Sequence, residues 1–117
     1  MTDRIKTGAK GEQIATDYLK NKGYTILERN WRSNRKEIDI IAEYQNLIVF
    51  VEVKTRKSDY YGYPEESVTP IKQEHILQAA EDYILLHDVH KEIRYDIISV
   101  IMNHQIQKVY HIEDALT

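Results

Sequence analysis

Residues 37–54 read EIDIIAEYQNLIVFVEVK, and this stretch decides the fold class. Two segments rich in β-branched residues, 37–43 and 47–54, flank the polar turn Tyr44-Gln45-Asn46. Such an arrangement is typical of a β-hairpin. The second segment is almost continuously apolar, which is typical of a strand that is buried on both faces. The stretch therefore predicts two antiparallel strands, the second of them central in a sheet.

The segments on either side complete an α/β pattern. Helical spacing of apolar residues predicts one helix from about Thr7 to Lys22 and another from Pro70 to about His87, the second capped by Thr69. Further strands are predicted at 24–28, 93–101 and 106–112, with polar loops at 29–36 and 55–68. The order α-β-β-β-α-β-β predicts an α/β fold with a central mixed sheet flanked by helices. With 117 residues, we expect a single domain over 1–117.

Composition excludes several classes of protein. With 42% apolar and 30% charged residues, the chain has the composition of a globular domain rather than a disordered one. It has no cysteine, which excludes a disulfide scaffold, a thiolate zinc site and a cysteine nucleophile. The longest apolar run is Leu47–Val51, and the N-terminus lacks the apolar stretch of a signal peptide. We therefore expect no membrane span and a cytoplasmic location.

The charge is unevenly distributed along the chain. Residues 1–36 hold nine Lys/Arg and four Asp/Glu, whereas residues 37–117 hold seven and fifteen, for a total of −3. Charge alone favours a solvated surface of uneven charge. A basic N-terminal third is also compatible with nucleic-acid binding by one face, and the surplus of acids with a metal site.

Charged residues inside the two apolar strands carry the candidate chemistry. Asp39 lies within the first strand, and Glu52 and Lys54 share one face of the second because residues two apart in a strand point the same way. Charges are costly to bury without partners, so these residues need partners or a ligand. A two-residue turn at Gln45-Asn46, or a four-residue loop over 44–47, would place Asp39 opposite Glu52 and Glu37 opposite Lys54. A three-residue loop would shift the register and send the acids to opposite faces.

Two opposed carboxylates repel each other unless a cation lies between them, and Mg²⁺ prefers oxygen ligands. A bound divalent metal polarises a phosphoryl oxygen and lowers the pKa of bound water, and a nearby lysine can stabilise charge on the phosphate. An acid followed after twelve residues by Glu-x-Lys is the set that metal-dependent phosphodiester hydrolysis requires. The same residues also fit a simple Glu37–Lys54 ion pair, with Asp39 and Glu52 turned to solvent.

Further motifs accompany this set: Gly8-x-x-Gly11-Glu12-x-x-Ala15-x-x-Tyr18-Leu19, Gly23-Tyr24, Arg29-Asn30, Glu37-Ile38-Asp39, Val49-Phe50-Val51-Glu52-Val53-Lys54-x-Arg56, Val68-x-x-x-Lys72, residues 79–83, and Arg94-Tyr95-Asp96. Through them the chain resembles, over nearly its whole length, the YraN-like family of uncharacterised bacterial proteins. That family is related to the PD-(D/E)xK nuclease superfamily and is similar to archaeal Holliday junction resolvases. The resemblance implies a restriction endonuclease-like domain. The family usually has glycine where this chain has Lys36, which affects the expected turn but leaves the acids and Lys54 in place.

The resemblance also implies a site. Asp39 and Glu52 match the metal-binding acids, Lys54 matches the catalytic lysine, and Glu12 matches a helix acid that completes the site. Helical spacing places Glu12 at the edge of the apolar face, which is compatible with this role. The implied cofactor is Mg²⁺, with Mn²⁺ as a substitute, and the implied substrate is DNA. Cutting a four-way junction requires two sites, so a homodimer would fit.

Other residues are candidates for supporting roles. Glu37 is an accessory candidate, and Lys72 shares the inward helix face with Ile76, so it either reaches the site or extends along the surface to solvent. Trp31 is expected to anchor its loop. Tyr60, Tyr61 and Tyr63 fit either an aromatic rim over a substrate or ordinary loop packing. Candidate phosphate contacts are Arg29, Arg32, Arg35 and Arg56, and no role is expected for His75, His104 and His111.

Three functions therefore remain open. The first is a Mg²⁺-dependent endonuclease acting on branched or otherwise structured DNA. The second is a nucleic-acid-binding module without catalysis, which would use the basic N-terminal third. The third is a protein-interaction module, for which the net acidity leaves room.

Overall fold

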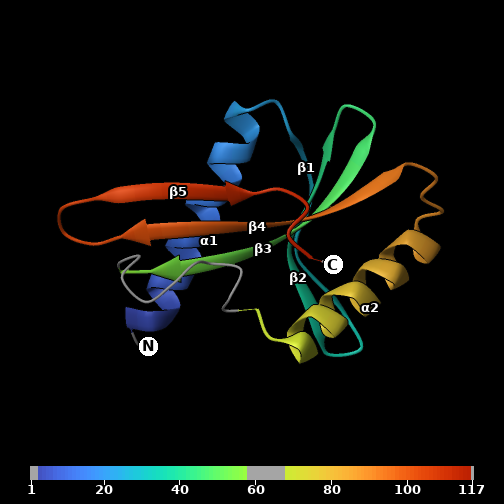
Figure 1. Ribbon diagram of the computed structural model, residues 1–117, viewed down its shortest axis with the longest axis horizontal. Coiled ribbons are helices and arrows are strands. Elements are labelled where there is room, and N and C mark those ends of the chain that lie inside the picture. The colour runs from blue at the N-terminus through green and yellow to red at the C-terminus, as the bar shows by residue number, and fades with distance from the viewer. Residues whose placement is uncertain (1–2, 58–67, 117) are drawn as a thin grey trace.

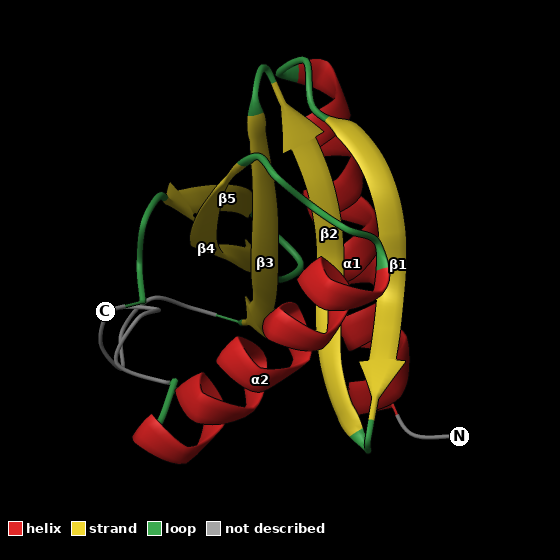
Figure 2. Ribbon diagram, turned by 90° about the vertical axis from the view of Figure 1, so that its right-hand side faces the viewer, coloured by secondary structure: helices red, strands yellow, loops and turns green. Residues whose placement is uncertain are grey.

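The structure is a computed structural model that describes residues 3–57 and 68–116. A five-stranded sheet of order β1-β2-β3-β4-β5 separates two helices, α1 on one face and α2 on the other (Figures 1 and 2). The elements are α1 (Asp3–Asn21), β1 (Thr25–Ser33), β2 (Lys36–Tyr44), β3 (Leu47–Arg56), α2 (Pro70–Leu86), β4 (Glu92–Met102) and β5 (Gln107–Ile112). The predicted α/β class and element order are confirmed. Tyr60, Tyr61 and Tyr63 lie outside the described residues.

The sheet is mixed because its chain connections differ. Strands β1, β2 and β3 form antiparallel pairs, α2 crosses over to make β4 parallel to β3, and β5 returns antiparallel to β4. In β3, residues 48–52 are all buried because a helix covers each face. Among the helices of the described ranges, none is long and apolar enough to cross a membrane.

Each face of the sheet has its own apolar core. On the α1 face, Ala15 and Leu19 pack with strand residues that include Ile40 and Val51. On the α2 face, Ala79, Ala80 and Tyr83 pack with strand residues that include Ile38, Ile41 and Phe50. Two separate cores explain why β3 is a nearly continuous apolar run rather than an alternating one.

The local signals at the ends of elements are confirmed in three places. Tyr44 pairs with Leu47, so the predicted two-residue turn at Gln45-Asn46 is present. The side chain of Thr69 accepts a hydrogen bond from Lys72 N at 3.2 Å, and Pro70 opens α2. His87 is the C-terminal cap of the same helix.

The predicted loop at 29–36 is wrong, because β1 continues to Ser33 and pairs with β2 as far as Lys36. β1 is an edge strand with an alternating burial pattern, so its exposed positions tolerate charged residues that resemble a loop in composition. The turn itself is Asn34-Arg35, with φ of 50° and 68°. Both residues adopt the left-handed conformation of a tight hairpin turn, which therefore forms with Lys36 in place of glycine. Trp31 still anchors this region, edge-on to Tyr83 at 5.3 Å between ring centroids.

α1 approaches β3 unusually closely at Gly11. A methyl group on Gly11 would overlap the side chain of Thr55, with its carbon 3.0 Å from Thr55 Cβ. Gly8, one turn earlier, has open space around it. Glycine at position 11 therefore sets the distance between helix and sheet next to the position from which the Glu12 side chain projects.

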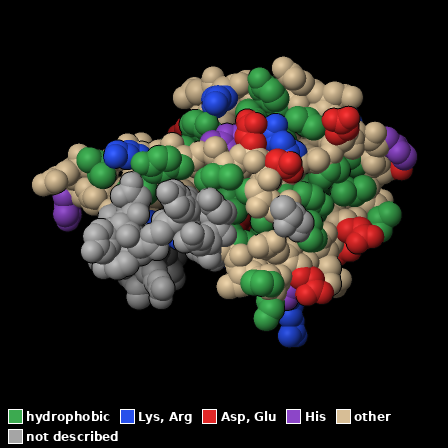
Figure 3. Space-filling model, in the orientation of Figure 1, with side chains coloured by type: hydrophobic (Ala, Val, Ile, Leu, Met, Phe, Trp, Pro, Cys, Tyr) green, Lys and Arg blue, Asp and Glu red, His purple; other side chains and the backbone are tan. Residues whose placement is uncertain are grey.

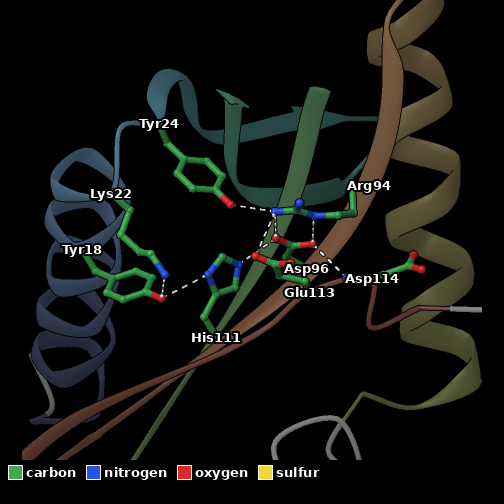
Figure 4. Close-up of polar contacts among 8 residues, drawn as sticks. All are labelled: Tyr18, Lys22, Tyr24, Arg94, Asp96, His111, Glu113 and Asp114. Atoms are coloured by element: carbon green, nitrogen blue, oxygen red, sulfur yellow. Dashed lines mark hydrogen bonds and ion pairs between the residues drawn. The ribbon is translucent and has the colours of Figure 1, made fainter. Parts of the chain in front are cut away.

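A buried charge network joins α1, β4, β5 and the C-terminal segment (Figure 4). The Asp96 side chain is fully buried and accepts hydrogen bonds from Arg94 Nε and Nη2, both at 2.9 Å, and from Asp114 N at 3.1 Å. His111 Nε2 lies 2.7 Å from Asp96 Oδ2, and His111 Nδ1 lies 3.2 Å from the Tyr18 hydroxyl. Burial alone would raise the pKa of Asp96, but the hydrogen bonds from His111, Arg94 and Asp114 outweigh burial and hold this pKa below its usual value.

We expect Gly11→Ala and Gly8→Ala to change stability in opposite directions. Gly8→Ala should stabilise the protein by about 0.5–1 kcal/mol because alanine favours the helix. Gly11→Ala should lower the free energy of unfolding by about 1–3 kcal/mol because its methyl group overpacks against Thr55. Urea denaturation of both variants checks this prediction. A stabilising Gly11→Ala would show that the close approach imposes no constraint.

We expect Asp96→Ala to lower the free energy of unfolding by about 3–5 kcal/mol at neutral pH, because Arg94 would lose its buried partner. Because the folded-state pKa of Asp96 is depressed, this advantage of the wild type is present above the unfolded pKa of about 3.9 and is lost as pH falls through the lower folded-state pKa. Urea titrations at neutral and acidic pH measure both effects. His90→Ala, which removes an exposed ion pair with Asp88, is the control and should change little. Equal effects of the two variants would contradict a stabilising role of the network.

Candidate functional site

The candidate site lies where β2 and β3 separate. Their pairing runs from Tyr44–Leu47 to Ile40–Val51 and stops there, whereas β3 stays paired with β4 as far as Arg56. Figure 2 shows the two strands diverging toward the arrowhead of β3, near the start of α2. The N–H of Val53 donates a hydrogen bond to Asp39 Oδ2 at 2.8 Å. Asp39 therefore fills the opening between the two strands.

The alternation of β2 breaks at the same residue. Ile38 packs in the α2-face core, whereas Ile40, two residues later, packs in the α1-face core. In a regular strand these two residues would share a face. On the neighbouring strand, Asn30 lies between the partners of Ile38 and Ile40 and has a φ of 52°. This irregularity lets Asp39 lie at the edge of both layers instead of inside one of them.

Three carboxylates converge here from two distant segments. One oxygen each of Glu12, Glu37 and Asp39 lies within 4.8 Å of the others, and all three side chains are partly buried. α1 supplies Glu12 beside the close contact at Gly11, and β2 supplies the other two. An all-oxygen set of this size suits a hard divalent cation such as Mg²⁺ or Mn²⁺.

The electrostatics of Asp39 reflect this crowding. Burial raises the pKa of its carboxyl to about 8. The negative charges of Glu52, Glu12 and Glu37 act in the same direction, and the hydrogen bond from the Val53 N–H acts against them. Without a compensating cation, the ionised form of Asp39 is therefore disfavoured in the folded protein.

The carboxylate of Glu52 forms ion pairs with two lysines. Its side chain is only 4% exposed, and Glu52 Oε1 lies 2.8 Å from Lys72 Nζ and 3.7 Å from Lys54 Nζ. Lys72 comes from the first turn of α2 and Lys54 from β3, two residues after Glu52. Of the two positions considered for Lys72, the structure shows the one that reaches the site.

The two ammonium groups differ electrostatically. Burial lowers the pKa of Lys54, and the adjacent positive charge of Lys72 lowers it further, against the opposing effect of Glu52. Burial would also lower the pKa of Lys72, but the hydrogen bond and charge of Glu52 outweigh it and raise this pKa. Lys72 is thus the stronger partner of Glu52, and Lys54 is the lysine more readily available for proton exchange.

The structure brings Glu12, Glu37, Asp39, Glu52, Lys54 and Lys72 to one region, although in an arrangement that differs from simple cross-strand pairing. The predicted register is present in all five β2–β3 pairs, but the ladder ends one pair before Asp39 and Glu52. The alternative of a Glu37–Lys54 ion pair with both acids in solvent is wrong. Glu37 contacts Arg32 at 3.2 Å instead, and Glu52 is buried.

The four candidate phosphate contacts lie in different settings. Arg29 Nη1 donates to Gln13 Oε1 of α1 at 3.0 Å, and Arg32 pairs with Glu37. Arg35 is exposed in the β1–β2 turn, and Arg56 is the last residue of β3. Two of the four arginines therefore contact Gln13 and Glu37, while Arg29, Arg32 and Arg35 are all exposed and Arg56 is partly buried.

Sequence reasoning missed the role of His111 and the contact between Gly11 and Thr55. No local pattern marks either one, because each depends on an element far along the chain. The charged pair Arg94 and Asp96 carried a usable signal. Two opposite charges at i and i+2 on one face of an otherwise apolar strand indicate a buried ion pair.

We expect Asp39→Asn to stabilise the metal-free protein in a pH-dependent way. Folding takes up a proton at Asp39 between its unfolded pKa of about 3.9 and its folded pKa of about 8, so the wild type loses stability as pH rises through this window. Asparagine removes the charge and keeps an acceptor for the Val53 N–H. The gain in melting temperature should therefore grow from about pH 4 to about pH 8 and then level off. Thermal melts in chelator, with the exposed Asp17→Asn as control, check this, and equal melting temperatures at pH 8 would contradict it.

Comparison with known proteins places the chain in a family. Residues 11–100 match the model of the uncharacterised protein family UPF0102. A UPF0102 protein of Flavobacterium psychrophilum is 42% identical over 115 residues, which cover 98% of this chain and 97% of the relative. Relatives from Persephonella marina and Clostridium botulinum are 48% and 52% identical, covering 92% and 82% of this chain and 90% and 80% of their own lengths. These matches confirm the YraN-like resemblance that the motifs indicate, and the chain belongs to the UPF0102 family.

Proposed function

We propose that this chain is a divalent-metal-dependent nuclease that hydrolyses phosphodiester bonds in DNA, with branched or otherwise structured DNA as its substrate. The observation that carries the proposal is the convergence of Glu12, Glu37 and Asp39 beside the Glu52–lysine group. Nothing about the packing of the two cores requires these charges at the opening between β2 and β3. Perturbed ionisable groups that gather in this way are typical of catalytic sites.

The donor set fits Mg²⁺ or Mn²⁺. Three carboxylates offer oxygens within 4.8 Å of one another. Burial and, after it, the neighbouring negative charges raise the pKa of Asp39, and a cation would compensate those charges. Glu12, Glu37 and Asp39 would hold the metal. When bound, it would polarise a phosphoryl oxygen and acidify a water molecule.

Glu52 has a different place in this proposal from the one that the family resemblance implies. Its carboxylate holds the ammonium groups of Lys72 and Lys54 beside the metal position. Lys54, with its lowered pKa, is suited to accept a proton from the attacking water. Lys72, with its raised pKa, stays charged and can stabilise negative charge on the phosphate.

The arrangement favours catalysis over nucleic-acid binding alone. A binding surface needs available cations, and Arg29 and Arg32, although exposed, are already paired with Gln13 and Glu37. The ionised carboxylate of Asp39 is disfavoured in the metal-free fold, and a binding module would gain nothing from it. A metal-dependent reaction explains this cost.

Metal titration by calorimetry tests the proposal without a guess about the substrate. We expect the wild type to bind Mn²⁺ and Mg²⁺, and Asp39→Asn and Glu12→Gln to lose binding because each removes one of the converging ligands. Glu81→Gln, an exposed charge change on α2, is the matched control and should bind as the wild type does.

Cleavage assays then test the chemistry. Labelled duplex, flap and four-way DNA should be cut in Mn²⁺ or Mg²⁺ but not in chelator. Asp39→Asn and Lys54→Ala should each slow cleavage by more than about 100-fold, whereas Glu81→Gln should not. Persistent cleavage or metal binding in both Asp39→Asn and Glu12→Gln would overturn the site assignment.

A further inference from the structure

A second surface feature lies at the same end of the sheet as the carboxylates. A groove of about 750 Å³ runs between the N-terminal half of α1, the residue that follows β3, and the hairpin that joins β4 to β5. These three parts of the chain lie together at the left of Figure 1. Ile14, Met102 and Ile106 give the groove an apolar lining. Ile14 and Met102 also pack against the α1-face core, and none of the residues proposed to hold the metal lines the groove.

The charge of the groove contrasts with that of the whole chain. Among the described residues that line it, Lys10, Lys57 and His104 are the basic ones and none is Asp or Glu, although the chain carries a net charge of −3. Both lysines are exposed, and within the described ranges neither takes part in an ion pair. On the face drawn in Figure 3, Asp and Glu side chains are visible in the upper middle and along the right-hand side. The groove therefore suits an anionic ligand.

Hydrogen bonds hold the hairpin wall of the groove in place. Asn103 Nδ2 donates to the Lys57 carbonyl at 2.9 Å, which fastens the hairpin to the end of β3. Asn103 Oδ1 accepts from the backbone N–H groups of Gln105 and Ile106 at 2.8 and 3.0 Å. The Asn103 side chain thus stabilises the turn and also fixes the backbone of Lys57 against it. A preformed groove binds without first ordering its own walls.

Two parts of the chain, α1 and the end of β3 with the residue that follows it, contribute residues both to the groove and to the region of the carboxylates and lysines. On α1, Lys10 and Gln13 flank Gly11-Glu12, so the helix turn that lines the groove also carries a metal-site acid. On the other side, Lys57 follows Lys54 by three residues, about 10 Å of extended chain. Gln13 also accepts the hydrogen bond from Arg29. A flexible polyanion in the groove can therefore reach the proposed reaction centre.

We propose that this groove binds an unpaired nucleic-acid strand next to the bond that is cut. The inference rests on the proposed function and names the substrate feature that the protein recognises. Lys10 and Lys57 contact phosphates, while bases and sugars lie on the apolar lining of Ile14, Met102 and Ile106. Paired bases cannot reach that lining because a duplex presents phosphates outward, so the groove selects strands that leave the duplex.

Fluorescence anisotropy in chelator tests binding apart from cleavage, with a labelled oligothymidine and a blunt hairpin duplex as probes. We expect Lys10→Gln/Lys57→Gln to weaken oligothymidine binding about tenfold or more at 0.1 M salt and to reduce the slope of log K against log salt by about 1.4, the value for two lost phosphate contacts on a single strand. Duplex binding should change far less. Lys20→Gln/Lys91→Gln removes the same charge from exposed positions that do not line the groove, and should leave oligothymidine binding unchanged.

The outcomes separate this inference from the proposed nuclease function. Oligothymidine binding equal in the two double variants, no oligothymidine binding by the wild type, or an equal loss for duplex would each overturn the groove assignment. None of these results bears on metal-dependent cleavage of duplex DNA. Conversely, groove-dependent strand binding without cleavage in any metal would support the groove and overturn the nuclease.

Discussion

The separation of β2 from β3 is the constraint on which the candidate site depends. β3 follows β4 along its whole length, and β2 leaves it after the Ile40–Val51 pair. The Val53 N–H then lacks a strand partner, and the Asp39 side chain takes that place. Because Asp39 substitutes for main-chain pairing, its carboxylate is held firmly at the opening. Glu12 can join it only because α1 approaches closely enough at Gly11.

The fold tolerates the unfavourable burial of Asp39 because its apolar cores are well packed and the buried carboxylate of Asp96 is fully hydrogen-bonded. Both faces of β3 lie in apolar cores, and the buried charge of Asp96 has partners on both of its oxygens. Asp39 and Asp96 illustrate two treatments of a buried carboxylate. Hydrogen-bond donors surround Asp96 and keep its pKa low despite burial, whereas burial and the neighbouring acids raise the pKa of Asp39. Such a contrast within one small sheet is expected when one site stabilises the fold and the other serves function.

Much of the fold can be predicted from the sequence because its signals are local. The β-branched run at 47–54, the short turn before it and the Thr69-Pro70 cap depend on neighbouring residues only. The importance of Asp39, Glu52 and Lys54 follows from the cost of burying charge in apolar strands. The contact of Glu52 with Lys72, by contrast, depends on how α2 crosses the sheet, and no local spacing specifies that. The extension of β1 through Arg29 and Arg32 cannot be recognised from the sequence either, because edge strands and loops share a polar composition.

The network around Asp96 also constrains the order in which the chain can fold. Asp96 lies in β4, but two of its partners, His111 and Asp114, belong to the last residues of the chain. During synthesis from the N-terminus, β1, β2 and β3 can pair while β4 still lacks these donors. A nascent chain that ended before His111 would have to bury the Asp96 carboxylate with Arg94 as its main partner. The last residues of the chain therefore complete the network only after the rest has been synthesised, and a chain that ends before His111 should be less stable and more readily degraded.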